Sequence, residues 1–255
     1  MKEEIISLKK YVPEERTQKI FAKVFDSSTI AAVHKLALRG FIDHIEFVIS
    51  TGKEAHVFRA RDRAGNFRAV KIYKTLTTDF KHMINYIAGD ERFKHVPKDR
   101  RGLVFAWTRK ESKNLEKARN AGVRVPLAIG YIENALVMEF IGSKEGEAAK
   151  TMKEVGVRNL EKAYSTIIEW IARMYKTDLI HSDLSEYNVL VNETEEGEEE
   201  LVLIDIGQGV LTTHPKAREF FERDARNVSK YFTKKGLEKD YEEVYREIKE
   251  AKERL

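Results

Sequence analysis

The chain has 255 residues and a net charge of +4; 42% of the residues are hydrophobic, 35% are charged and none is cysteine. This composition indicates a globular protein with a heavily charged exterior, and it excludes disulfides and thiolate metal sites. No apolar run reaches the ~20 residues of a membrane span, and the charged N-terminus lacks the apolar core of a secretory signal, so we expect a cytoplasmic protein without membrane contact.

The N-terminal segment 1–46 is predicted to form a helical extension. Helical character extends over residues 13–46: Ser28 is a candidate cap, apolar residues follow it at helical spacing, and Gly40 stands at the stop position. The pattern then changes from helical to strand-like, so we place a boundary at the start of the segment 47–141.

Residues 47–141 are predicted to form a small lobe with a five-stranded sheet and one helix. The strand-like runs FVISTG, HVFRARD and FRAVKIYK come first, and the turn DRAGN separates the last two. A helix from Leu103 to about Ala121 precedes two more strands, which turn at Glu133–Asn134. The stretch from about 84 to 101 combines glycine, proline and dense charge without a clean period, and we interpret it as a mobile segment.

Residues 142–255 are predicted to form a reduced, mainly helical lobe. From Leu160 apolar residues recur at helical spacing, and after Pro215 two amphipathic helices are expected. Between these helical segments lie two strand-like runs, NVLVN and LVLIDI. The acidic stretch ETEEGEEE joins them, and we interpret it as the solvated tip of a hairpin.

Polar residues crowd the stretch IHSDLSEYNVLV, where the first of these two strands begins. His181, Asp183 and Asn188 fit the phosphoryl-transfer pattern H-x-D-L-x-x-x-N. Asp205 ends the paired strand, and a hairpin can bring it to the same site as Asn188. Amide and carboxylate oxygens suit Mg²⁺ or Mn²⁺ beside a nucleotide, whereas Asp183 could orient an attacking hydroxyl and accept its proton. We expect His181 to hold the loop by hydrogen bonding.

No single residue of this group indicates a catalytic site, because a histidine and an aspartate two positions apart are common in loops. One alternative is a metal hydrolase with His181 and Asp183 as ligands, but no second histidine cluster accompanies them. The combination of types and spacings favours phosphoryl transfer.

The nucleotide-binding half of such a site is expected upstream, around Lys71 in RAVKIYK. Lys71 shares a strand face with Ala69, and an inward lysine is costly unless it meets an anion. The alternative is an edge-strand lysine that faces solvent. We prefer Glu111 as its ion-pair partner and keep Glu116 as the rival, although a solvated glutamate fits the sequence nearly as well.

The stretch ISTGKEAHVF is similar to a reduced glycine-rich loop. Aligned on Val57, the pattern G-x-G-x-x-G-x-V places its glycines at three small residues, which would let the backbone approach phosphates closely. These residues are Ser50, Gly52 and Ala55. Further donors could come from Ser50, Thr51 and Lys53.

Together, STGKEA, HSDLSEYNVLV and IDIGQGV resemble the RIO family of atypical serine/threonine protein kinases, in particular its Rio-one subfamily, from about Ile49 to Phe232. The resemblance implies an α+β fold: a bilobal, protein-kinase-like fold with a truncated C-lobe, an N-terminal helical extension and ATP between the lobes. It implies Asp183 as catalytic base, and Asn188 and Asp205 as ligands of Mg²⁺ or Mn²⁺. The implied cofactor-binding residues are Ser50, Thr51, Gly52, Lys53, Val57, Lys71, Glu111, Met138, Glu139, Phe140 and Ile141.

Partners are also implied by the resemblance. Members of the family act in maturation of the small ribosomal subunit, so a precursor of that subunit is an expected partner. The basic run Arg92–Arg101 could touch RNA phosphates, although a solvated loop is the preferred interpretation. We expect the protein to phosphorylate itself near the mobile segment. Candidate acceptors are Thr77, Thr78, Thr108 and Ser112.

Two departures from ordinary protein kinases concern the regulation of the enzyme and the group that accepts the phosphate. Ser182 replaces the arginine of H-R-D, so control by a phosphorylated activation loop is not expected. A helical pattern starts by Pro215 without an A-P-E segment, which leaves no obvious platform for a long peptide. Two alternatives therefore stay open: an ATP-gated ribosome assembly factor with little protein phosphorylation, and a small-molecule phosphotransferase of the same fold. An aspartyl-phosphate is known in RIO ATPases, so Asp205 is also expected to act as a nucleophile in slow ATP hydrolysis.

Overall fold

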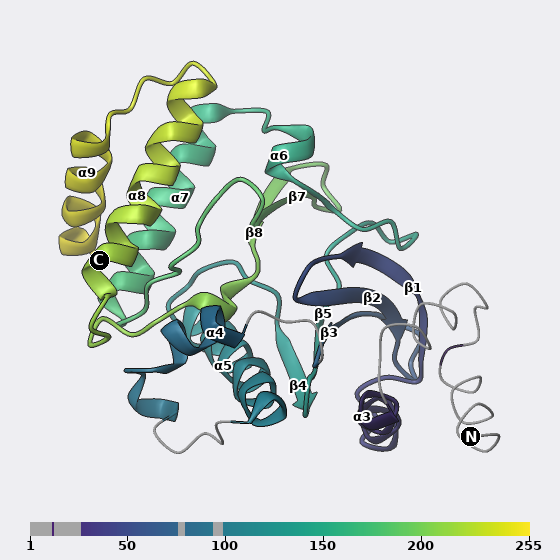
Figure 1. Ribbon diagram of the computed structural model, residues 1–255. Coiled ribbons are helices and arrows are strands. Elements are labelled where there is room, and N and C mark those ends of the chain that lie inside the picture. The colour runs from purple at the N-terminus through teal and green to yellow at the C-terminus, as the bar shows by residue number, and fades with distance from the viewer. Residues whose placement is uncertain (1–11, 13–26, 76–79, 94–98) are drawn as a thin grey trace. The chain divides into compact units, whose positions relative to one another are not determined.

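The computed structural model describes Val12 and residues 27–75, 80–93 and 99–255, and these fall into two compact units (Figure 1). Unit 1 consists of Met1–Ile87, His95–Ser112 and Leu127–Phe140, and unit 2 of Ala88–Lys94, Lys113–Pro126 and Ile141–Leu255. The last change of unit along the chain falls between Phe140 and Ile141. No helix among the described residues is long and apolar enough to cross a membrane.

Unit 1 is built on an antiparallel five-stranded sheet with the order β1-β2-β3-β5-β4, which confirms the predicted set of strands. The strands are β1 (His44–Thr51), β2 (Ala55–Arg61), β3 (Phe67–Tyr73), β4 (Ala128–Ile132) and β5 (Ala135–Glu139). The turn after β2 closes with a hydrogen bond from Gly65 N–H to the Asp62 carbonyl, at the predicted DRAGN sequence. β-branched and aromatic residues suit such half-buried strands.

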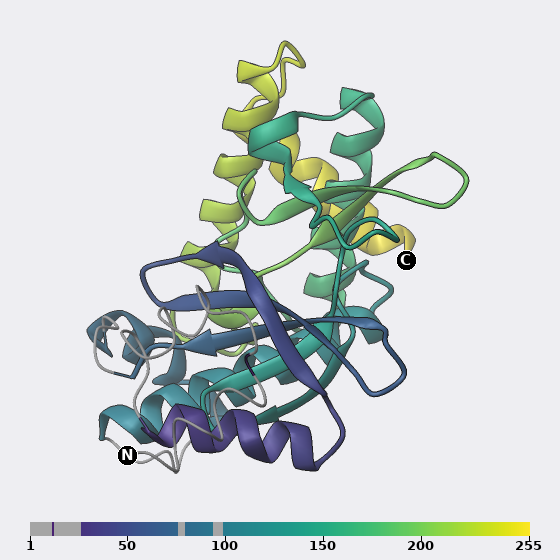
Figure 2. The ribbon, with the colours of Figure 1, turned by 90° about the vertical axis from the view of Figure 1, so that its right-hand side faces the viewer.

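Helix α3 (Ser27–Leu38) packs against this sheet (Figure 2). Its buried Val33 and Leu36 join Phe58 and Val70 of the sheet in one apolar cluster. The helix stops before Gly40, as predicted, and the φ of 75° at Gly40 is a left-handed conformation that suits glycine after a helix.

The helical prediction for residues 13–46 is wrong beyond α3. His44 and Ile45 pair with β2, and this pairing overrides the local helical spacing. Ser28 lies within α3 rather than at its cap, because the described helix already includes Ser27. Residues 13–26 lie outside the described part of the chain.

The stretch 84–101, which is predicted to be mobile, contains parts of three helical elements. α4 (Phe80–Ile87), the short 3₁₀ helix η1 (Glu91–Phe93) and α5 (Arg100–Asn120) are all present. Met83, Tyr86 and Ile87 are buried, and their spacing forms one apolar face that is too short to stand out in the sequence. The sequence pattern therefore gave no sign of α4 and η1. Residues 94–98 lie outside the described part, and mobility stays a prediction.

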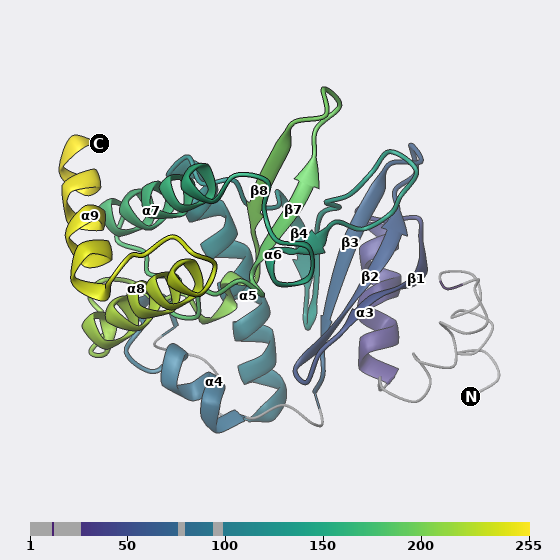
Figure 3. The same ribbon diagram turned by 90° about the horizontal axis from the view of Figure 1, so that it is seen from above.

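Unit 2 combines a three-stranded sheet with three long helices (Figure 3). The helices are α7 (Leu160–Lys176), α8 (Ala217–Lys234) and α9 (Tyr241–Arg254), and the strands are β6 (Lys150–Thr151), β7 (Val189–Glu193) and β8 (Glu199–Leu203). The predicted hairpin and helices are confirmed. β6, the following helix α6 (Met152–Val155) and the 3₁₀ helix η2 (Ile206–Gln208) were not anticipated, because each is four residues or shorter.

Candidate active site

Lys71 of β3 meets its predicted partner inside unit 1. Its Nζ lies 2.7 Å from Oε1 of Glu111 on α5, and the Tyr73 hydroxyl donates to the other oxygen of the same carboxylate. Both charged side chains are nearly inaccessible, with exposed fractions of 9% for Lys71 and 2% for Glu111. An inward lysine is thus compensated by a carboxylate, and the structure selects Glu111 over Glu116, which is exposed.

We expect Glu111→Gln to lower the free energy of unfolding by about 3–5 kcal/mol, because it leaves the buried Lys71 charge without its carboxylate. Denaturant unfolding of purified protein measures this change. Glu116→Gln is the matched control on the exposed face of α5 and should change stability by less than about 0.5 kcal/mol. Equal effects of the two variants would contradict the structural importance of the pair.

The predicted phosphate-binding stretch forms the tip of the β1–β2 hairpin. Ser50, Thr51, Gly52 and Lys53 are all exposed there. The Gly52 N–H donates to the carbonyl of Ala55, and Lys74 Nζ donates to the Gly52 carbonyl at 2.7 Å. Val57 lies opposite Ser50 in the strand register and is half-buried. The tip therefore presents small residues and hydroxyl groups to solvent, as a loop over phosphates requires.

Four of the implied cofactor-binding residues, Met138, Glu139, Phe140 and Ile141, lie where the chain changes unit. Met138 pairs with Ala69 of β3, and the Glu139 N–H donates to the carbonyl of Leu127 within unit 1. The Phe140 ring lies 5.4 Å from the Phe67 ring, measured between centroids. In unit 2 the carbonyl of Ile141 accepts from the Ala149 N–H.

His181 supports the predicted catalytic loop in unit 2. The ring is buried, its Nδ1 accepts from the Asp183 N–H at 3.3 Å, and its Nε2 lies 3.2 Å from the Ile204 carbonyl. Since Nδ1 accepts, the neutral ring carries its proton on Nε2 and donates it to Ile204. Both ring nitrogens are engaged, so His181 orients the loop and is not placed to act as a metal ligand.

Asn188 is oriented as a metal ligand would need to be. Its Nδ2 donates to the Asp183 carbonyl at 2.8 Å, which leaves Oδ1 as the atom able to bind a cation. The Asn188 carbonyl accepts from the Ile204 N–H at 2.9 Å, and Asp205 follows directly. Within residues 27–75, 80–93 and 99–255 no group of three or more His, Cys, Asp or Glu side chains could hold a metal. A metal at Asn188 and Asp205 would therefore need further oxygen ligands, such as nucleotide phosphates and water.

Asp183 and Asp205 differ in their surroundings. Asp183 is half-buried, and its Oδ2 accepts from Nε2 of Gln208 at 3.0 Å. Asp205 is exposed and has a left-handed backbone with φ 59° and ψ 52°, which is uncommon for a residue other than glycine and is typical of functional sites. Gln208 was missed by the sequence analysis, although a polar residue between two glycines in IDIGQGV was a usable signal.

Side chains of α8 hold the backbone of the catalytic loop. The Asp224 carboxylate accepts from the N–H groups of Ser182 at 2.8 Å and Leu184 at 2.9 Å. Arg223 donates to the Ser182 carbonyl, and Asn227 Nδ2 donates to the Leu184 carbonyl at 3.0 Å. These α8 residues were also missed, because nothing in the sequence links them to the loop. The sequence offers one hint of a buried polar contact, since Asp224 stands among the apolar positions of α8.

Burial raises the pKa of Asp224 to about 7 from its ordinary value of 3.8. Burial is the largest cause, and the nearby Asp183 charge adds to it, while the two backbone N–H groups and Arg223 act in the opposite direction. The folded protein therefore holds the Asp224 proton more tightly than the unfolded chain does.

This raised pKa predicts a pH-dependent difference between wild type and Asp224→Asn. The stabilisation from the Asp224 proton is fully present below about pH 4 and is lost as the pH rises toward 7, with a slope of at most about 1.4 kcal/mol per pH unit. The stability advantage of the wild type over the variant should therefore shrink between pH 4 and 7. Urea unfolding of both proteins across this range measures it; a constant or growing advantage would contradict the raised pKa.

Two further predictions need correction. Thr108 is fully buried, and its Oγ1 donates to the Val104 carbonyl within α5, so it is not an accessible phosphoacceptor. Arg92 is not a surface cation for RNA, since Asp90 and Asn114 engage its guanidinium. Thr77 and Thr78 lie outside the described residues.

Comparison with known proteins places the chain in a family. The family model described as RIO domain matches residues 56–244. The chain is 44% identical to the RIO-type serine/threonine-protein kinase Rio1 of Haloferax volcanii, over 89% of this chain and 76% of that protein. It is 36% identical to the human serine/threonine-protein kinase RIO1, over 84% of this chain and 38% of that protein.

A solved structure shows the same fold. The Rio2 kinase of Chaetomium thermophilum, crystallised as an ADP/Mg²⁺-phosphoaspartate complex, matches with a TM-score of 0.65 and 21% identity, over 86% of this chain and 66% of that one. This confirms the protein-kinase-like combination of helices and sheets. The chain therefore belongs to the RIO family of serine/threonine protein kinases, in its Rio1 group, and is an ATP-dependent phosphotransferase.

Proposed function

We propose that this protein transfers the γ-phosphate of ATP with Asp183 as the base that orients the acceptor and takes its proton. The observation that carries the proposal is the set of contacts that ties the predicted residues together in unit 2. Asn188 donates to the Asp183 carbonyl, Ile204 donates to the Asn188 carbonyl, and the His181 ring contacts both the Asp183 N–H and the Ile204 carbonyl. A base held in this way contributes about 10²–10⁴-fold to a rate.

The remaining predicted residues would bind the nucleotide and its cation. In this proposal Lys71, held by Glu111, meets phosphate oxygens, and the exposed hairpin tip covers them with donors from Ser50, Thr51, Gly52 and Lys53. Asn188 and Asp205 hold Mg²⁺ or Mn²⁺, which when bound would neutralise phosphate charge. The adenine lies against Val57, Met138 and Phe140 and is read by backbone groups of Glu139 and Ile141. We also propose the division into residues 1–46, 47–141 and 142–255, except that β1, which begins at His44, belongs with the second part.

In a second reaction, Asp205 itself accepts the phosphate. Helix α8 begins at Ala217, shortly after Asp205, and leaves little chain for a peptide platform. Without an acceptor hydroxyl, one carboxylate oxygen of Asp205 attacks the γ-phosphorus, and the bond to the bridging oxygen breaks to release ADP. Water then attacks the acyl phosphate, which releases phosphate and restores the carboxylate. The phosphoaspartate in the Rio2 complex from Chaetomium thermophilum is a precedent for this chemistry.

The proposed process is maturation of the small ribosomal subunit in the cytoplasm, with a subunit precursor as partner and an exposed hydroxyl, of this chain or the particle, as occasional acceptor. A contact with RNA through Arg100 and Arg101 belongs to this proposal, since both are exposed at the start of α5. ATP hydrolysis and protein labelling should be measured with and without purified precursor particles. We expect hydrolysis to rise at least about tenfold with particles; an unchanged rate with labelling of an unrelated protein would contradict the process.

An ATP-gated assembly factor that phosphorylates little protein is the second candidate, and the short stretch between Asp205 and α8, which leaves little chain for a peptide platform, favours it. In that case the particle stimulates hydrolysis while the label remains on this chain. A small-molecule phosphotransferase is disfavoured, because the relatives are named as serine/threonine protein kinases.

A further inference from the structure

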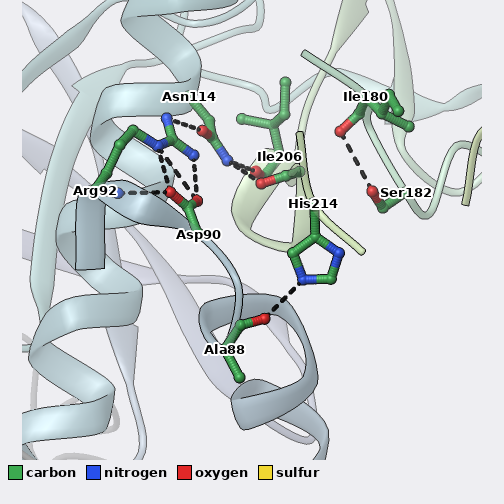
Figure 4. Close-up of polar contacts among 9 residues, drawn as sticks. Ala88, Asp90, Arg92, Asn114, Ile180, Ser182, Ile206 and His214 are labelled. Atoms are coloured by element: carbon green, nitrogen blue, oxygen red, sulfur yellow. Dashed lines mark hydrogen bonds and ion pairs between the residues drawn. The ribbon is translucent and has the colours of Figure 1, made fainter. Parts of the chain in front are cut away.

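A buried asparagine contacts the loop that follows Asp205 at two points (Figure 4). Nδ2 of Asn114, on α5, donates to the Ile206 carbonyl at 2.9 Å and to the Gly209 carbonyl at 2.8 Å. These two carbonyls flank the turn that carries Gln208. One side-chain amide thus spans the whole η2 turn.

The orientation of Asn114 is itself fixed. Nη1 of Arg92 donates to Oδ1 of Asn114 at 2.9 Å, and since a guanidinium can only donate, the amide oxygen must face Arg92 and the amide nitrogen must face the loop. The carboxylate of Asp90 in turn accepts from Nη2 of Arg92 at 2.7 Å and from Nε at 2.9 Å. Asn114 and the Asp90 side chain are fully buried, so the three side chains form a closed polar network.

The loop is fitted closely around this amide. A Cβ atom added to Gly209 would lie 3.0 Å from Asn114 Nδ2 and 3.2 Å from the Ile180 carbonyl, so a side chain there would force these neighbours apart. On the other side Val210 and Ile180 exchange two backbone hydrogen bonds of 2.9 Å. The turn therefore has little freedom to shift while Asn114 is in place.

Two groups of the proposed reaction depend on this turn. Asp205 directly precedes Ile206 and has a left-handed backbone that the surrounding contacts must maintain. Gln208, within the turn, donates to Asp183. Release of the Ile206 and Gly209 carbonyls would let both Asp205 and Gln208 move.

A purely structural role fits the network less well. Two fully buried polar side chains and a largely buried arginine are expensive to desolvate, and apolar residues of similar volume usually stabilise a core as well or better. The donors of Asn114 also serve one target, the backbone of the η2 turn, rather than being spread over the core.

We infer that Asn114 is a positioning residue for phosphoryl transfer: it fixes the turn that sets Asp205 and Gln208, and Arg92 and Asp90 fix Asn114. The inference rests on the proposed function of Asp205 and Asp183. It also makes the segment 88–93, which supplies Asp90 and Arg92, a structural support of the metal-binding loop.

Asn114→Asp tests the inference, because the change keeps the shape and replaces two donors with an oxygen that repels both carbonyls. We expect the metal concentration at half-maximal ATP turnover to rise about 10–100-fold, with a lower maximal rate, as for other residues that orient metal ligands. Asn120→Asp is the matched control: the same substitution, on an exposed position of the same helix, with wild-type values expected.

Amide hydrogen exchange gives a readout independent of activity. In Asn114→Asp the Gly209 and Val210 amides should exchange at least about tenfold faster, while the Ile204 amide, bonded to Asn188, keeps its rate. Uniformly faster exchange with an unchanged metal requirement would mean a structural role only and would overturn the inference. Wild-type values of turnover, metal requirement and exchange in Asn114→Asp would also overturn the inference.

A second variant covers failure of Asn114→Asp to fold. Arg92→Lys keeps a charge beside Asp90 but loses the guanidinium that contacts Asp90 and Asn114 at once, and it should show the same changes at smaller size. If Arg92→Lys is folded and matches wild type in all three readouts, the inference is wrong. If the wild type itself turns over no ATP, the proposed function fails, whereas the exchange of the Gly209 amide still tests the placement of the turn by Asn114.

Discussion

Asp183→Asn should slow phosphoryl transfer by about 10²–10⁴-fold while the affinity for ATP and metal changes by less than about tenfold. The reason is a division of labour: in the proposed site Lys71, Asn188 and Asp205 hold the nucleotide, and Asp183 acts on the acceptor. Asparagine keeps the oxygen that accepts from Gln208, so the loop should stay in place while the basic oxygen is lost.

Single-turnover transfer and direct ATP binding should be measured on the same preparations. Asp178→Asn is a suitable control, because Asp178 is exposed in the same unit and its acceptor role toward Thr212 survives the substitution. Should ATP affinity fall in parallel with the rate, Asp183 would be a nucleotide ligand rather than the base.

Asp205→Asn should slow ATP hydrolysis by about 10³-fold or more. An amide oxygen can still contact a cation, but it brings no negative charge and cannot form an acyl phosphate. We therefore expect the metal requirement to rise and the covalent phosphate to disappear together.

Titration with Mg²⁺ and Mn²⁺ separates the two roles of Asp205. If saturating metal restores hydrolysis in Asp205→Asn to near the wild-type rate, the carboxylate is only a ligand and transfer goes to other groups. Asn188→Asp is the comparison variant: it adds charge at the other proposed ligand but loses the donor to the Asp183 carbonyl, so it should lower the rate without removing the covalent phosphate on Asp205.

Short-range patterns in the sequence predicted much of the fold and part of the site. The five strands of unit 1 follow from β-rich runs between turns, and the hairpin that links Asn188 to Asp205 follows from two strand patterns. The choice of Glu111 over Glu116 was less secure in the sequence, because helical spacing allows both. Only the packing of α5 against β3 distinguishes the buried glutamate from the exposed one.

The remaining contacts depend on tertiary structure that no local pattern encodes. Asp224 and Asn227 reach the catalytic loop from α8, about 40 residues later in the chain. Asn114 acts on backbone carbonyls of Ile206 and Gly209, which any sequence would supply. α4 was missed because an eight-residue helix offers only one or two repeats of its apolar face.

The most direct test of the account is to trap the protein during turnover of ATP labelled in its γ-phosphate. After acid quenching, wild-type protein should carry a label that hydroxylamine removes, and peptide mapping should place it on Asp205, because an acyl phosphate is labile where a phosphoserine is not. Asp205→Asn should carry no such label. A label that resists hydroxylamine and persists in Asp205→Asn would contradict the covalent step and leave Asp205 as a metal ligand in ordinary transfer to hydroxyl groups.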